Sequence, residues 1–233
     1  FSLTVTPGKL GEAVKAFLLR ASHGYAVART APIVIAERVT DLLALLLLAL
    51  VGVFQFDVDR RFLVAGAAVV LGGVLVVSID PLAELALGLC ARIPGVRRFA
   101  PKLREMHATT ATLLHPKALA LATAISTLSW FLECLAFTVV VRGFPGVGLD
   151  LRAATFIYAA MTIAGALSFL PGGLGVTEAG MLALLVRFGT GLGRGQAAAA
   201  VFVTRGATLW FAVALGLPAL VLYARRKPVA VEG

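Results

Sequence analysis

The pattern Pro-Gly-x-Leu-Gly occurs twice in this chain, at residues 7–11 and at residues 171–175. A glutamate follows each copy, Glu12 in the first and Glu178 in the second. A lone arginine then lies in an apolar segment, Arg38 after the first copy and Arg205 after the second. Helix-breaking motifs at matching positions of two halves point to the binding site of a transporter built from inverted repeats. This repeat therefore constrains the fold more than any other feature.

The composition places the chain in a membrane. Hydrophobic residues make up 60% of the 233 residues, charged residues only 14%, and the mean hydropathy is +0.96. A soluble domain carries about a quarter charged residues. Several apolar segments approach the roughly 20 residues that a transmembrane helix needs. We therefore predict an all-α integral membrane protein, a polytopic helix bundle with these candidate spans: residues 31–54, 62–79, 118–141, 153–170 and 196–223.

The basic residues set the predicted orientation in the cell membrane. They cluster in residues 92–104 and in the C-terminal tail after residue 223, and such clusters normally mark the cytoplasmic side. With both regions in the cytoplasm, the segment 153–188 starts and ends on the outer face. It must then turn back on itself, and we expect the turn at Pro171-Gly172-Gly173. The same reasoning turns the first motif into a hairpin that opens toward the cytoplasm.

Two inverted repeats follow from this topology. The first comprises residues 1–117 and includes a cytoplasmic loop at residues 80–117, and the second comprises residues 118–233 with a short cytoplasmic tail. A candidate helix precedes the second motif but none precedes the first, so we expect further spans before Phe1. Proline removes an N–H and glycine permits a tight turn. The predicted hairpin residues are Pro7, Gly8, Gly11, Pro171, Gly172, Gly173 and Gly175.

Each hairpin has two interpretations. The segment 176–188 spans about 20 Å as a helix, less than the roughly 30 Å of a hydrocarbon core, which indicates a re-entrant arm. Alternatively, the Pro-Gly pairs only end helices at the membrane surface. The two copies, with shared charges downstream, favour the re-entrant arrangement.

Charged side chains inside apolar segments face a bundle interior or a cavity. We expect Arg38 and Arg205 to hold an anionic group and favour a lipid phosphate, because the planar guanidinium matches phosphate in a bidentate manner. The alternative is structural, with Arg38 paired to Asp41 and Arg205 to Glu178. Glu12, Glu178 and Glu133 are expected to balance the arginines or to receive a cationic headgroup, and Glu133 and Glu178 are candidate proton carriers. The full set of candidate substrate-binding residues is Glu12, Lys15, Glu37, Arg38, Asp41, Glu133, Glu178 and Arg205.

Several function classes are disfavoured. The net charge of +9 resides in loops beside spans and forms no aromatic-rich basic face, so no nucleic-acid partner is expected. The three histidines lack metal-ligand spacing, and the glycines form no dinucleotide or P-loop signature. No nucleophile–base arrangement is visible. We therefore predict no metal, no cofactor and no enzymatic activity.

The two motifs also resemble those of a known family. Residues 168–178, Ser-Phe-Leu-Pro-Gly-Gly-Leu-Gly-Val-Thr-Glu, resemble the signature of flippase-like membrane proteins, which include the transmembrane region of lysylphosphatidylglycerol synthases. Residues 7–12, followed by Glu37-Arg38-x-x-Asp41, resemble the family's other signature. Lys15 stands where arginine is common in the family. The resemblance implies about two additional spans before the first signature.

The resemblance implies lipid handling. The leading interpretation is a flippase-like transporter that moves a phospholipid or glycolipid headgroup between leaflets. The alternative is a membrane subunit that binds lipid and presents it to a partner glycosyltransferase or synthase. A small membrane enzyme that uses the buried carboxylates is a third alternative. Ten residues follow Tyr223, so lysyl transfer is not expected of this chain. Trp130 and Trp210 lie within the predicted spans, where we expect them to pack between helices or between subunits of an oligomer.

Overall fold

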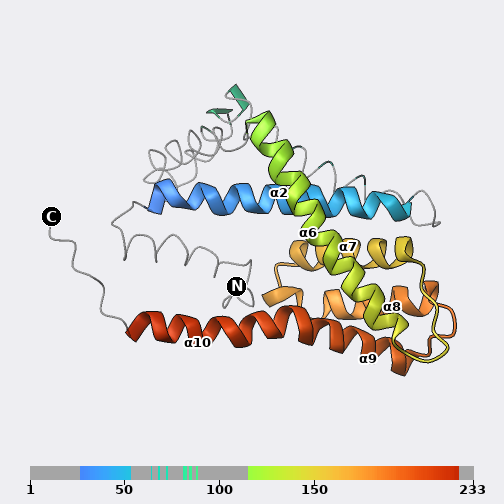
Figure 1. The fold of residues 1–233 in the computed structure, drawn as a ribbon. Helices are drawn as coiled ribbons and strands as arrows, with labels where there is room; N and C mark the ends of the chain where they lie inside the picture. Colours follow the sequence, from blue (N-terminus) through green and yellow to red (C-terminus); the bar gives the residue numbers. More distant parts are fainter. Residues whose placement is uncertain are drawn as a thin grey trace. The chain divides into compact units, whose positions relative to one another are not determined.

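The computed structural model describes residues 27–53 and 115–225, together with scattered positions between residues 64 and 88 (Figure 1). The described elements are helical, as predicted. The first motif, Glu12, Lys15 and most of the predicted span 62–79 lie outside the described residues. The helices are α2 (Val27–Val53), α6 (Pro116–Arg142), α7 (Leu151–Leu167), η3 (Pro171–Gly173), α8 (Val176–Phe188), α9 (Arg194–Arg205), η4 (Gly206–Trp210) and α10 (Phe211–Arg225).

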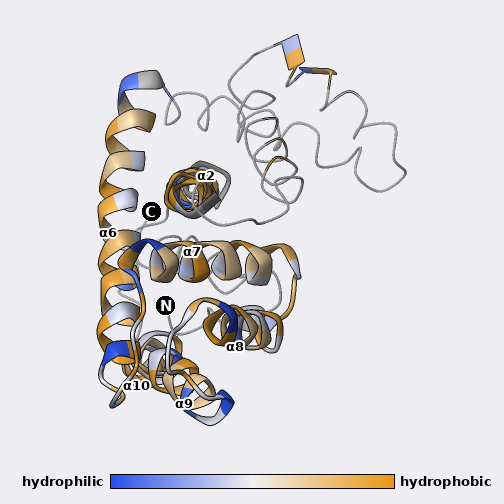
Figure 2. Cartoon of the chain, turned by 90° about the vertical axis from the view of Figure 1, so that its right-hand side faces the viewer, coloured by the Kyte–Doolittle hydropathy of each residue, from blue (hydrophilic) through white to orange (hydrophobic). Residues whose placement is uncertain are grey.

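Two described helices are long and apolar enough to cross a membrane, by length and composition. They are Lys117–Arg142, with 26 residues, and Arg194–Leu222, with 29 residues. They match the predicted spans 118–141 and 196–223. Figure 2 shows α6 as mainly hydrophobic between hydrophilic ends. Helix α2 is 27 residues long and carries Glu37, Arg38 and Asp41 within it.

The described residues fall into two compact units. The first unit contains residues 44–53 and 126–225, and the second contains residues 27–43 and 115–125 with the scattered positions. The predicted division into repeats at residues 117 and 118 is a different partition of the chain and stays a prediction. The candidate site described below lies within the first unit.

Helices α7 and α8 form the predicted hairpin. A one-turn 3₁₀ helix, η3, lies at the predicted proline and joins the two arms. At the other end, Gly148 and Thr190 exchange two backbone hydrogen bonds, with N···O distances of 3.0 and 2.9 Å. The chain that enters α7 and the chain that leaves α8 therefore lie side by side. The arms contain 17 and 13 residues, so they extend about 25 and 20 Å.

Glycines let the hairpin arms approach closely. Gly173 has φ +67°, a conformation that side chains with a Cβ avoid. A Cβ atom at Gly173 would lie 2.9 Å from the Cα atom of Gly165 and 2.7 Å from the hydroxyl oxygen of Thr177. Nearer the middle of the arms, Gly180 leaves room for the Met161 side chain. Small residues at helix contacts are the usual means of tight packing in membranes.

The core of the first unit lies between α6, α7 and α8. Phe137 on α6 is fully buried, and its ring centroid lies 5.6 Å from that of Tyr158 on α7. Met181 and Leu185 are buried on the inner face of α8. Phe156 of α7 packs against Gly52 of α2, where an added Cβ would overlap the ring. Because these helices are mutually packed, polar groups on them are held in fixed positions.

The predicted span 196–223 contains an irregularity that hydropathy does not reveal. Helices α9 and α10 are joined by the π-helical segment η4, in which the backbone accommodates one extra residue per turn (Figure 1). The Thr204 and Thr208 hydroxyls donate to the carbonyls four residues earlier, at 2.8 and 2.9 Å. Such bonds often accompany helix bending, and π segments occur frequently at functional sites.

Candidate functional site

Arg205 is the last residue of α9 and directly precedes the π segment. It lies eleven residues beyond Arg194, or about 17 Å along a helix long enough to span a membrane. Its side chain is 14% exposed. An arginine at such depth requires polar partners.

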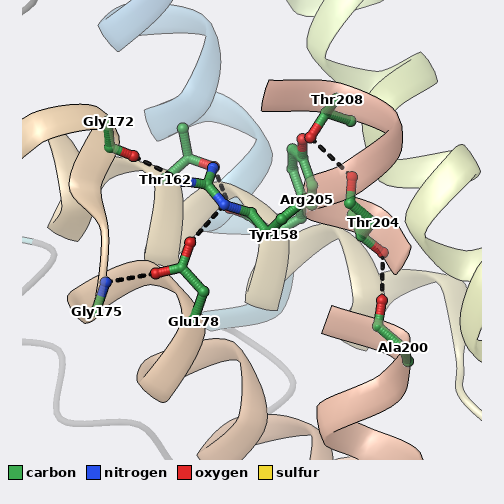
Figure 3. A network of polar contacts seen from close by, with 9 residues as sticks. All are labelled: Tyr158, Thr162, Gly172, Gly175, Glu178, Ala200, Thr204, Arg205 and Thr208. Atoms are coloured by element: carbon green, nitrogen blue, oxygen red, sulfur yellow. Dashed lines mark hydrogen bonds and ion pairs between the residues drawn. The ribbon is translucent and has the colours of Figure 1, made fainter. Parts of the chain in front are cut away.

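Those partners come from the second motif (Figure 3). The Nε–H group of Arg205 donates to Glu178 Oε1 at 2.5 Å, and Nη2 donates to the carbonyl oxygen of Gly172 at 2.7 Å. The other carboxylate oxygen, Glu178 Oε2, accepts the backbone N–H of Gly175 at 2.6 Å. Glu178 thus caps the N-terminus of α8 and neutralises Arg205 at once. One arginine therefore ties the hairpin turn to the long helix α9–η4–α10.

The guanidinium retains capacity for a ligand. Arginine has five N–H donors, and the described residues accept hydrogen bonds from two of them. Both hydrogens of Nη1 and one of Nη2 remain for another acceptor. Phosphate oxygens suit this planar donor pair. The arrangement is chemically able to hold an anionic headgroup beside Glu178.

Both ion pairs of the structural alternative are formed. Besides the Arg205–Glu178 pair, Arg38 Nη2 lies 3.0 Å from Asp41 Oδ2, and these side chains are 30% and 21% exposed. The neighbouring Glu37 accepts the Thr40 hydroxyl through its backbone carbonyl at 3.0 Å. These residues of α2 belong to the second unit, whereas Arg205 belongs to the first. The expected joint action of Arg38 and Arg205 stays a prediction.

Glu133 on α6 belongs to the first unit and has a neutral partner. Its Oε2 accepts the hydroxyl of Tyr158, a residue of α7, at 3.0 Å. Tyr158 is buried, with 5% of the residue exposed, and its hydroxyl also interacts with Thr208 of the π segment. Sequence reasoning missed Tyr158 and Thr208. A tyrosine within an apolar segment was the available signal, because a buried phenol requires a hydrogen-bond partner.

The remaining candidates divide by location. Pro171, Gly172, Gly173 and Gly175 form the turn that Arg205 and Glu178 contact, whereas Pro7, Gly8, Gly11, Glu12 and Lys15 lie outside the described residues.

Among the residues that the structure describes, no group of three histidine, cysteine or acidic side chains is close enough to bind a metal ion. Cys134 is buried and has a free thiol.

Comparison with known proteins gives a consistent result. The sequence model of one protein family, the lysylphosphatidylglycerol synthase TM region, matches residues 1–216 of this chain. Two relatives, each named UPF0104 membrane protein, come from Methanothermobacter thermautotrophicus. One is 39% identical over 93 residues, which cover 40% of this chain and 27% of the relative. The other is 27% identical over 232 residues and covers 90% of this chain and 68% of the relative. No solved structure matches the chain.

Proposed function

This chain belongs to the family of the lysylphosphatidylglycerol synthase transmembrane region and is a multi-pass membrane protein, and we propose that it moves a phosphate-bearing lipid headgroup between leaflets. One observation carries the proposal. A mid-span arginine is fixed to a helical hairpin through two of its donors while the others remain for a ligand.

The local chemistry supports phosphate as the group bound. Glu178 presents two anionic oxygens, one to Arg205 and one to the N-terminus of α8. A phosphate group offers oxygens of the same charge and similar spacing, and helix N-termini favour anions. A headgroup phosphate can therefore join or displace the carboxylate at Arg205. The acyl chains remain in the surrounding lipid during the exchange.

The hairpin supports movement in addition to binding. Its arms of about 25 and 20 Å are shorter than the roughly 30 Å hydrocarbon core. We propose that the turn at Pro171 lies within the membrane and that the first motif forms an inverted counterpart with Arg38 as its arginine. Irregular backbone at that depth is tolerated where it borders a wet cavity. Such a cavity provides the polar route for a headgroup.

The test is a lipid-scrambling assay in proteoliposomes that contain headgroup-labelled phospholipids. We expect Arg205→Gln to abolish movement and Arg205→Lys to reduce it strongly, because lysine lacks the bidentate fork. Arg194→Gln is the matched control, since Arg194 is an exposed arginine at the start of the same helix. Its movement rate should equal that of the wild type.

The assay also separates this proposal from the alternative. If folded wild-type protein moves no lipid but co-purifies with a lipid-modifying enzyme, the presenting role replaces transport. If Arg205→Gln moves lipid at the wild-type rate, Arg205 is a structural tie and the site proposed here is wrong.

A further inference from the structure

We propose that Glu133 is a proton-binding site that couples lipid movement to proton uptake. This inference rests on the proposed function above and concerns the coupling of movement rather than headgroup binding. It starts from a charge that the hairpin site leaves uncompensated. In the described first unit, Arg205 and Glu178 neutralise each other, whereas Glu133 takes part in none of the described ion pairs.

Glu133 lies deep in a membrane-crossing helix, and its described partner is neutral. It lies nine residues before Arg142, or about 14 Å from that end of a membrane-crossing helix. Its described hydrogen-bond partner is uncharged: the Tyr158 hydroxyl on α7 donates to it, and Cys134 follows it on α6. A carboxylate at such depth needs a cation or a proton. Protonation of the free oxygen Oε1 forms one O–H bond and changes the side-chain charge from −1 to 0.

The donor set favours a proton over a metal cation. Hard cations take about six oxygen ligands. The described contacts at Glu133 bring together its own carboxylate and the Tyr158 hydroxyl, with the Thr208 hydroxyl beyond it. Two or three oxygens satisfy a proton but leave a sodium or calcium ion poorly coordinated.

A continuous contact chain links this site to Arg205. Tyr158 joins Glu133 to Thr208. Thr208 lies three residues after Arg205 in the π segment (Figure 3). The Thr208 hydroxyl also donates to the carbonyl of Thr204, the residue before Arg205, at 2.9 Å. Neutralising Glu133 weakens its bond with the Tyr158 hydroxyl. The change reaches a backbone segment with irregular hydrogen bonding, which is the kind of element that switches between two arrangements.

The experiment measures lipid movement in proteoliposomes from acid to mildly alkaline pH. For the wild type we expect one titration, with a rate that changes roughly tenfold per pH unit on one limb. Glu133→Gln keeps the shape of the side chain without a titrating group, and its profile should be flat. Tyr158→Phe removes the hydroxyl that donates to the carboxylate and should change the profile without making it flat. Asp150→Asn, at an exposed loop residue, should reproduce the wild-type profile.

Infrared spectroscopy tests the same site without transport. A carboxylic-acid C=O band should titrate in the wild type and be missing from Glu133→Gln. A wild-type rate that is independent of pH, or one that depends on sodium instead, overturns coupling while the proposed function stands. If no lipid moves, the proposed function fails, and the infrared band alone decides whether Glu133 binds a proton. Absence of the band refutes the site.

Discussion

Replacing Glu178 and replacing Arg205 should change the affinity for lipid in opposite directions. Glu178 uses both oxygens, for Arg205 and for the Gly175 N–H, whereas glutamine offers a single acceptor oxygen. Glu178→Gln therefore loses one charge-assisted hydrogen bond, a stability loss of about 1.5–3 kcal/mol. The same change removes the anion that competes with phosphate for Arg205.

The gain in affinity follows from the charges. Two unit charges 4 Å apart attract by about 4 kcal/mol at an effective dielectric constant of 20. The two side chains are 14% and 19% exposed, so solvent and desolvation offset part of this energy. A net gain of about 1–2 kcal/mol makes phosphate binding roughly 5–30-fold tighter in Glu178→Gln. Arg205→Gln should weaken binding by at least a comparable factor.

The assay is a titration of a fluorescent short-chain phosphatidylglycerol with detergent-solubilised protein, accompanied by thermal unfolding of each variant. Asp150→Asn serves as the carboxylate control because Asp150 is exposed and lies in the loop before α7. Glu178→Gln and Arg205→Gln should shift the lipid affinity in opposite directions, and both should lower the melting temperature. Equal loss of binding in both variants would refute a phosphate role for Arg205 and leave the pair as a structural tie.

Two further predictions test the hairpin and its base. Gly173→Ala should destabilise the fold for two reasons. A side chain in a left-handed backbone costs about 1–2 kcal/mol, and overpacking against Gly165 and Thr177 costs about 1–3 kcal/mol. An unchanged unfolding midpoint would contradict the close packing. Arg142→Gln removes two hydrogen bonds to the carbonyl of Leu149, at 2.9 and 2.7 Å, and should cost about 1.5–3 kcal/mol. Its scrambling rate should match the wild type, and a slower rate would show that this loop takes part in transport.

The second half of the fold was predictable because its signals are local. Long apolar runs predicted α6 and the helix from Arg194 to Leu222, and the proline and glycines at 171–175 predicted the hairpin turn. Short-range backbone preferences and hydropathy determine both features. The pairing of Arg205 with Glu178 was one of two alternatives. Opposite charges in one bundle restrict the choice of partners, and the structure contains that pair.

Other parts of the site depend on tertiary contacts that the sequence pattern does not encode. The π segment requires one additional residue in a helical turn and leaves the hydropathy of the span unchanged. The bond from Arg205 to the Gly172 carbonyl uses a backbone atom, so no residue type signals it. Glu133 and Tyr158 are 25 positions apart and meet only because α6 packs on α7. The contact between Glu133 and Tyr158 therefore follows from the three-dimensional fold and not from the sequence pattern.

The backbone bridge between Gly148 and Thr190 has a consequence for how the protein is synthesised. It joins the two ends of the hairpin, although 42 positions separate them in the chain. The 13-residue arm α8 is too short to stop in a translocation channel as an independent span. We therefore expect both arms to enter the bilayer together, after α6 has been inserted. Arg205 emerges from the ribosome later than Glu178, so the growing hairpin acquires its counter-charge only when α9 has been made.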